Sequence, residues 1–190
     1  SRQSRPWGEV LRTLNKLSSN VDSRLLYLQL GVPAMADNPG QTTRALAERA
    51  VRQWLAAQRI AAPGLVLDNG SGLSRSERIS PAQLEGVIRA GLASRWAPEF
   101  LSSLPIVGVD GTMRNRLTAS PAQGLARLKT GTLRNVVALA GTMTDAAGQP
   151  LIVVAIVNHD AVVPRKLRPV LDGLIDWVAR TRFAPAPTGN

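Results

Sequence analysis

The chain contains no cysteine and a single histidine, His159, among its 190 residues. Without cysteine it can form neither a disulfide nor a thiolate metal site, and one histidine leaves any zinc site to carboxylates and water. No metal or other cofactor is therefore expected. A Ser-His-Asp triad would have to use His159, which stands beside Asp160 at the end of an apolar run. A histidine in such a place is more often a partly exposed loop residue than a catalytic base.

Long apolar runs, aromatic residues and negative charge are also scarce. No apolar run approaches the roughly 18 residues that span a bilayer, so no transmembrane segment is expected. Basic residues number 23 against 13 acidic ones, which gives a net charge of +10, but aromatic residues make up only 4%. The basic residues are scattered, whereas a nucleic-acid-binding domain clusters them among aromatics, so no nucleic-acid partner is expected. Attraction to a polyanionic surface such as a cell envelope fits the charge equally well.

The patterns that are present predict an α+β protein. Two apolar runs rich in β-branched residues, 136–143 and 151–157, flank a short segment containing Asp, Gly and Pro. They predict an antiparallel hairpin buried on both faces, and residues 65–67 predict a short buried strand. Helical spacing of apolar residues recurs in the segments 7–30, 42–59, 80–94 and 167–180. Helices flanking an antiparallel sheet are expected, with no domain boundary within residues 1–183 and a flexible tail at 184–190.

The first helical segment is interrupted by small polar residues. Around Ser18, Ser19 and Asn20 the sequence offers hydroxyl and amide side chains that compete with a helix backbone. We therefore expect two helices with a break at this point. On this stretch alone, the simplest interpretation is that Ser18 or Asn20 is a helix N-cap.

A Lys-Thr-Gly-Thr run precedes the predicted hairpin. Its members are Lys129, Thr130, Gly131 and Thr132. The run is expected on a strand that leads into the hairpin. There the glycine would let a ligand come close to the backbone, while the other side chains offer one positive charge and two hydroxyls. A Lys-Thr-Gly tripeptide alone is common by chance, so its weight depends on the rest of the chain.

Together these segments resemble the class C low-molecular-mass penicillin-binding proteins, the D-alanyl-D-alanine carboxypeptidase/endopeptidases of the penicillin-binding protein 4 type. Serine penicillin-recognising enzymes carry Ser-x-x-Lys, Ser-x-Asn and Lys-Thr-Gly in that order. The Ser-Ser-Asn at 18–20 is similar to the second motif and residues 129–131 to the third. A glycine-rich loop at 68–75, with one inserted-looking asparagine, and Asp-Gly-Thr at 110–112 also follow the family's order. The resemblance covers about residues 7–179 and favours a catalytic role for Ser18 over an N-cap.

One motif of the family is missing. No Ser-x-x-Lys occurs in the sequence, and the nearest match, at 13–16, begins with threonine. The resemblance therefore implies the C-terminal portion of a penicillin-binding domain. The missing N-terminal segment of the same protein would supply the nucleophilic serine and its lysine, together with further strands and helices.

The resemblance also implies a role for each remaining motif residue. Ser18 would join the proton relay, and Asn20 would hold the substrate amide and the missing lysine. The side chains of Lys129, Thr130 and Thr132 would face a C-terminal carboxylate, and the Thr132 N–H would be the second oxyanion donor. Ser18, Asn20 and Lys129 are accordingly predicted to converge on one cleft.

The implied activity is that of a serine D,D-carboxypeptidase/endopeptidase. Its partners would be peptidoglycan stem peptides and β-lactams, in the periplasm or otherwise outside the cytoplasmic membrane. A non-catalytic domain of the same fold, which binds muropeptides or another partner, is the main alternative. A β-lactamase or esterase of the same superfamily and a basic nucleic-acid-binding domain are the others.

Overall fold

The structure, a computed structural model, describes residues 6–160 and 163–184. The chain divides into two compact units, residues 1–103 and residues 104–190, each with its own packing. That residues 1–183 belong to one domain stays a prediction, and residues 185–190 of the predicted tail lie outside the described residues. Among the helices in the described ranges, none has the length and apolar character needed to cross a membrane.

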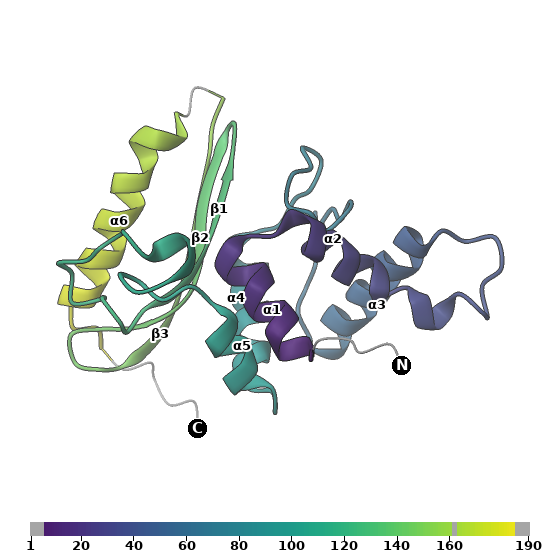
Figure 1. Ribbon diagram of the computed structural model, residues 1–190, viewed down its shortest axis with the longest axis horizontal. Helices are drawn as coiled ribbons and strands as arrows, with labels where there is room; N and C mark the ends of the chain where they lie inside the picture. The colour runs from purple at the N-terminus through teal and green to yellow at the C-terminus, as the bar shows by residue number, and fades with distance from the viewer. Residues whose placement is uncertain (1–5, 161–162, 185–190) are drawn as a thin grey trace. The chain divides into compact units, whose positions relative to one another are not determined.

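The first unit is helical (Figure 1). Its helices are α1 (Trp7–Leu17), α2 (Asn20–Gln29), α3 (Thr43–Ala57), α4 (Pro81–Leu92) and α5 (Ala97–Ser103), with a short 3-10 turn η1 (Val32–Ala34). The α1 helix packs against α5, and α2 packs against α3. Capping fixes where the later helices begin. Thr42 Oγ1 accepts the Ala45 N–H at 3.2 Å, and a capping box joins Ser80 and Gln83 at the start of α4.

The prediction of a strand at residues 65–67 is wrong. Only an isolated antiparallel bridge joins Val66 to Arg78, through two backbone hydrogen bonds of 3.0 Å. Leu65 is buried, but Val66 is 40% exposed. The apolar run is too short to build a ladder, because the chain turns directly into the glycine-rich loop that follows.

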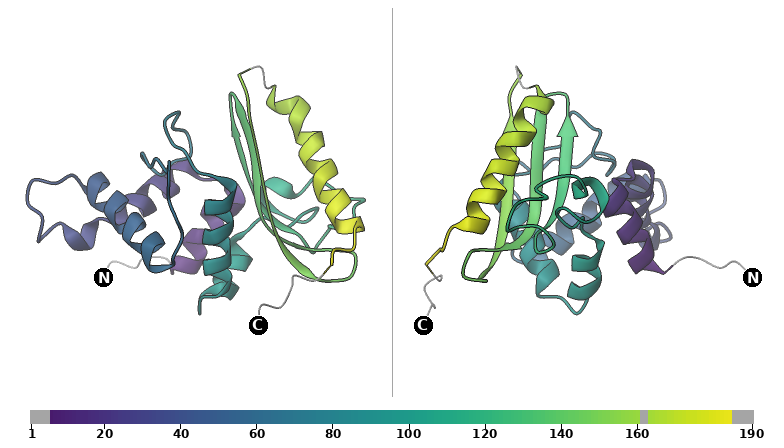
Figure 2. Two further views of the ribbon diagram at one scale, coloured as in Figure 1. Left: turned by 180° about the vertical axis from the view of Figure 1, so that it is seen from behind. Right: turned by 60° about the vertical axis from the view of Figure 1, so that its left-hand side comes forward.

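The second unit is a three-stranded antiparallel sheet with a helix along one face (Figure 2). Its strands are β1 (Arg127–Leu133), β2 (Val136–Thr144) and β3 (Pro150–Asn158), in that order across the sheet, and its helix is α6 (Pro164–Arg180). The predicted hairpin corresponds to β2 and β3. The Lys-Thr-Gly-Thr run lies on β1, the strand before the hairpin. The α+β class is therefore confirmed.

The core of this unit lies between the sheet and α6. From β2, Val137, Leu139 and Met143 are buried against Leu171 and Ile175 of the helix. Because successive side chains of a strand point to opposite faces, the alternate positions of β2 are only half-buried, as are the middle residues of β3. The prediction that both faces of the hairpin are buried is therefore wrong.

Candidate active site

The break between α1 and α2 is confirmed, and its geometry singles out Ser18. This residue follows the last residue of α1 with φ 54° and ψ 48°, in the left-handed region. Its N–H and that of Ser19 both donate to the Leu14 carbonyl and so close the end of the helix. Glycine or asparagine usually takes this position, because a side chain there costs about 1–2 kcal/mol. The same conformation occurs at Arg59 and Leu117, so the strain at Ser18 matters only together with the Ser-x-Asn motif.

The N-cap of α2 is Ser19. Its Oγ accepts the Asp22 N–H at 3.3 Å, while Asn20 is already the first helical residue and is exposed. The interpretation of Ser18 or Asn20 as the cap is therefore wrong, and neither of these side chains is needed to start the helix. A hydroxyl residue followed three positions later by an acidic one is a known helix-start pattern, and this signal could have identified Ser19.

The glycine-rich loop braces α2. Ser23 Oγ, in the first turns of the helix, donates to the Gly70 carbonyl at 2.5 Å. A Cβ atom at Gly70 would lie 2.4 Å from the Cβ of Tyr27, and the φ of Gly70 is +70°. Close approach and backbone conformation therefore both demand glycine there. The loop fixes the helix whose first residue is Asn20.

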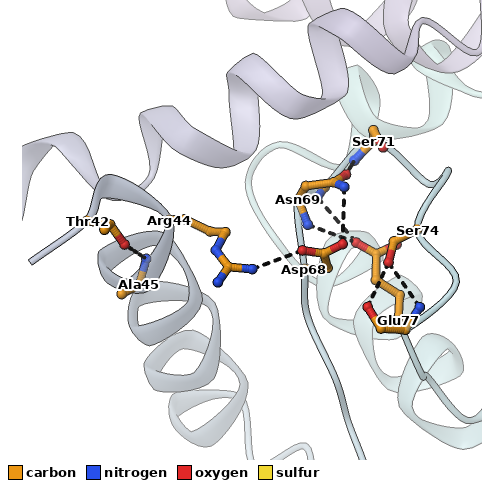
Figure 3. Close-up of polar contacts among 10 residues, drawn as sticks. Thr42, Arg44, Ala45, Asp68, Asn69, Ser71, Ser74 and Glu77 are labelled. Atoms are coloured by element: carbon orange, nitrogen blue, oxygen red, sulfur yellow. Dashed lines mark hydrogen bonds and ion pairs between the residues drawn. The ribbon is translucent and has the colours of Figure 1, made fainter.

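Polar contacts tie the residues of the loop to one another and to α3 (Figure 3). Glu77 Oε1 accepts the backbone N–H of Asn69 and of the next residue, both at 3.3 Å. Asn69 Oδ1 accepts the Ser71 N–H at 2.9 Å, and Arg44 of α3 pairs with Asp68 at 2.9 Å. These contacts satisfy backbone donors that a loop would otherwise leave to water, so the loop serves as a structural support. No local sequence pattern indicates the part that Glu77 plays.

In the second unit, β1 presents an edge suited to binding. The Leu128 N–H points away from β2 and donates to the Pro105 carbonyl at 2.8 Å. Backbone N–H groups alternate along a strand, so those of Thr130 and Thr132 face the same outer edge. Thr132 is exposed. Its N–H therefore faces the outer edge of β1, and its role as an oxyanion donor stays a prediction.

Lys129 brings a positive charge to this edge. Its Nζ donates to the Thr130 carbonyl at 2.7 Å. Burial lowers the pKa of the Lys129 ammonium. A partly desolvated ammonium forms stronger charge-assisted hydrogen bonds with a carboxylate than a fully hydrated one does.

Gly131 leaves space at the same edge. A Cβ atom there would make only an ordinary contact of 3.6 Å with the Cβ of Ala138. Gly131 is not among the residues with positive φ. Neither backbone conformation nor packing within the described chain demands glycine, so its small size is available for a ligand.

The Asp-Gly-Thr segment holds a residue whose role the sequence did not reveal. Thr130 Oγ1 donates to Thr112 Oγ1 at 3.0 Å. Thr112 lies in the short 3-10 turn η2 (Gly111–Met113), and Asp110 Oδ1 accepts the Ile106 N–H at 2.8 Å just before it. The partnership of two threonines 18 positions apart depends on how the chain folds back, which no local pattern reports.

The predicted site residues lie in two different units of the chain. Ser18 and Asn20 belong to the first unit, and Lys129, Thr130 and Thr132 belong to the second. That the two groups converge on one cleft stays a prediction. Within residues 6–160 and 163–184 no cluster of three or more metal-ligating side chains occurs.

Comparisons with curated proteins extend over most of the chain. The similar proteins include a D-alanyl-D-alanine carboxypeptidase of Actinomadura sp. (strain R39), 29% identical over 186 residues, and the D-alanyl-D-alanine carboxypeptidase DacB of Haemophilus influenzae, 31% identical over 159 residues. The alignments cover 95% and 82% of this chain but 33% and 32% of those proteins. The chain thus spans about a third of the length of the curated relatives that it matches.

Solved structures and a family model agree with these relatives. Penicillin-binding protein 4 of Haemophilus influenzae, complexed with a β-lactam, matches with a TM-score of 0.81 and 26% identity over 94% of this chain and 42% of that one. A predatory endopeptidase of Bdellovibrio bacteriovorus, with a TM-score of 0.70, 22% identity and coverage of 93% and 44%, shares the fold. Residues 1–178 match the family model described as the D-Ala-D-Ala carboxypeptidase 3 (S13) family. As its motifs predicted, the chain belongs to this penicillin-binding protein 4-like family of D-Ala-D-Ala carboxypeptidases.

Proposed function

We propose that this chain supplies two parts of the active site of a serine D,D-peptidase. One is the Ser18 corner, which consists of Ser18 and Asn20 and relays a proton. The other is the strand β1, which binds the substrate carboxylate. The substrates are the D-Ala-D-Ala ends or D-Ala cross-links of peptidoglycan, so the enzyme works outside the cytoplasmic membrane. The observation that carries the proposal is the left-handed Ser18, which ends α1 two residues before Asn20, while the side chain of Ser19 caps α2. Membership of the S13 family supports the reaction class.

The proposed reaction passes through an acyl-enzyme. A serine nucleophile forms an ester with the carbonyl of the penultimate D-alanine, the peptide C–N bond breaks, and water later hydrolyses the ester. The leaving amine needs a proton, which the Ser18 hydroxyl relays, while Asn20 holds the substrate amide. Lys129 and the hydroxyls beside it bind the terminal carboxylate, and the Thr132 N–H stabilises the oxyanion.

The nucleophile comes from polypeptide outside these 190 residues. The sequence holds no Ser-x-x-Lys, and the residue three positions after Ser18 is Val21. A serine hydroxyl without an adjacent base attacks amides negligibly at neutral pH. Ser18 is therefore a relay group in this proposal and not the attacking group.

A non-catalytic domain that binds muropeptides is the second candidate. The missing nucleophile motif is the observation that favours it. Such a domain would keep the carboxylate-binding edge of β1 and the Ser18 corner, but it would form no covalent bond with a β-lactam.

Intact-mass measurement after incubation with a penicillin separates these cases. The chain alone should gain no covalent adduct. The complete protein, or the chain mixed with the preceding segment, should gain one penicillin per molecule. An adduct on residues 1–190 alone would refute the external nucleophile, and peptide mapping would identify the serine responsible. A complete protein that takes up no penicillin would favour the non-catalytic domain.

A further inference from the structure

The hydroxyl pair formed by Thr130 and Thr112 poses a chemical problem for carboxylate binding. In the structure the Thr130 hydroxyl donates its only hydrogen to Thr112 Oγ1, at 3.0 Å. A carboxylate is an acceptor only, and Thr130 can bind it only by donating that same hydrogen. Thr130 must therefore give up its hydrogen bond to Thr112 in order to donate to a carboxylate.

A hydroxyl is the kind of partner that resolves this conflict. A backbone carbonyl in place of Thr112 Oγ1 would only accept, so it would be left without a donor once Thr130 turned away. A threonine hydroxyl carries one donor and two acceptor lone pairs, so it can exchange the two roles by rotation. We propose that Thr112 is a positioning residue whose hydroxyl changes from acceptor to donor when Thr130 binds the substrate carboxylate. The inference rests on the proposed function.

In the bound state the two hydroxyls form a directed chain. Thr112 donates to Thr130, and Thr130 donates to the carboxylate, so no proton is transferred and each oxygen keeps a partner. Consecutive hydrogen bonds of this kind polarise one another, which strengthens the contact with the charged end of the chain.

The second unit holds Thr112 firmly enough for this role. The next residue, Met113, is fully buried in the core, and its carbonyl accepts the Gly108 N–H at 3.0 Å. Shortly beyond it, Arg116 makes a two-pronged ion pair with Asp172 of α6, with N···O distances of 2.6 and 3.1 Å. The backbone of Thr112 thus belongs to an anchored turn, while the hydrogen of its hydroxyl can rotate.

The rival explanation is that the hydrogen bond of Thr112 only holds the turn against β1. Such a structural contact would stabilise the protein, but it would not make the protein distinguish a carboxylate from its ester. Selectivity for the carboxylate is therefore the property to measure. Acylation rates of the complete protein with a penicillin and with the methyl ester of the same penicillin, both followed by intact mass, report it directly.

Thr112→Val should slow acylation by the free acid about fivefold, the value of one ordinary hydrogen bond, and acylation by the ester less than twofold. Thr112→Ser keeps the hydroxyl and should restore the wild-type ratio. Thr118→Val changes another exposed threonine of the same segment and is the matched control; it should leave both rates unchanged. In a Thr130→Val background, Thr112→Val should have no further effect on the ratio, because the residue that it acts through is absent.

The outcomes separate the inference from the function on which it rests. Three outcomes would each overturn the role of Thr112 alone. Thr112→Val could slow acylation by the acid and the ester equally, or Thr112→Ser could fail to restore the ratio. The third is an undiminished effect of Thr112→Val in the Thr130→Val background. A wild-type complete protein that no penicillin acylates would overturn the proposed function and this inference together.

Discussion

Replacing Ser18 by glycine should give a more stable protein than replacing it by alanine, while both changes abolish its contribution to catalysis. Any residue with a Cβ pays about 1–2 kcal/mol for the left-handed backbone that Ser18 adopts at φ 54°. Glycine removes this strain, although its greater conformational freedom in the unfolded chain destabilises the folded state by about 0.5–1 kcal/mol. Compared with Ser18→Ala, which lacks the hydroxyl but keeps the strain, Ser18→Gly should be more stable by about 0.5–1 kcal/mol. Alanine is the proper reference because both variants lose the same hydroxyl contacts.

Thermal and urea unfolding of the two variants test this difference. In a protein of this size, a change of 1 kcal/mol moves the Tm by about 2–4 °C, so a shift of about 1–4 °C is expected. Both variants of the complete protein should lose penicillin acylation to a similar degree, because each lacks the relay hydroxyl.

Arg59 provides the matched control. It also has a left-handed backbone, with φ 58°, and it follows the end of α3 in the same unit. Arg59→Gly should gain a similar stability over Arg59→Ala and leave acylation unchanged. The reasoning would be refuted if Ser18→Gly were no more stable than Ser18→Ala while the Arg59 pair showed the gain. Retained acylation in Ser18→Gly would remove Ser18 from the proton relay.

Three further predictions concern the second unit and its pH dependence. Lys129→Ala should lower kcat/KM for both a penicillin and a D-Ala-D-Ala peptide about thirtyfold or more, since losing one partner of a desolvated charge pair costs about 2–5 kcal/mol; Ser74→Ala, in the supporting loop, should cost far less, and similar losses would show that the carboxylate binds elsewhere. Burial lowers the pKa of Lys129 from 10.5, so acylation should decline with rising pH before that value is reached, and Lys129→Arg, which stays charged, should move the decline to higher pH. Backbone hydrogen bonds, the most important from Phe183, hold the pKa of the Asp145 carboxyl below 3.8 in the folded protein. The ionised carboxylate therefore stabilises the fold fully above pH 3.8, and this stabilisation is lost as the pH falls through the pKa of the folded state. The Tm difference between wild type and Asp145→Asn should accordingly shrink in acid.

The predictions that held were those with a local signal. The spacing of apolar residues identified α3, α4 and α6, and two β-branched runs around an Asp-Gly turn identified the β2–β3 hairpin. The strand at residues 65–67 failed because strand formation depends on a partner strand, which a single apolar run cannot guarantee. The prediction that both faces of the hairpin are buried failed for a related reason. The sequence could not show that α6 covers one face of the sheet while the other face stays half-buried.

The candidate site divides in the same way. The helix break at 18–20 followed from local side-chain chemistry, and so did the strand that carries Lys129. The left-handed conformation of Ser18 did not, because nothing in the residue type requires it. The Thr112 partner of Thr130 and the Ser23 contact with Gly70 join segments 18 and 47 positions apart, and such contacts depend on tertiary structure.

Backbone strain alone would not have identified the site. Among the described residues, three that are not glycine have positive φ: Ser18, Arg59 and Leu117. Leu117 packs against the core of its unit, which accounts for its side chain, while nothing among the described contacts accounts for that of Arg59. Strain therefore becomes evidence at Ser18 only because it coincides with the Ser-x-Asn motif and with a cap already supplied by Ser19. If Arg59→Gly impaired acylation as Ser18→Gly should, the strain would report a shared structural need, and the case for a relay hydroxyl would rest on the motif alone.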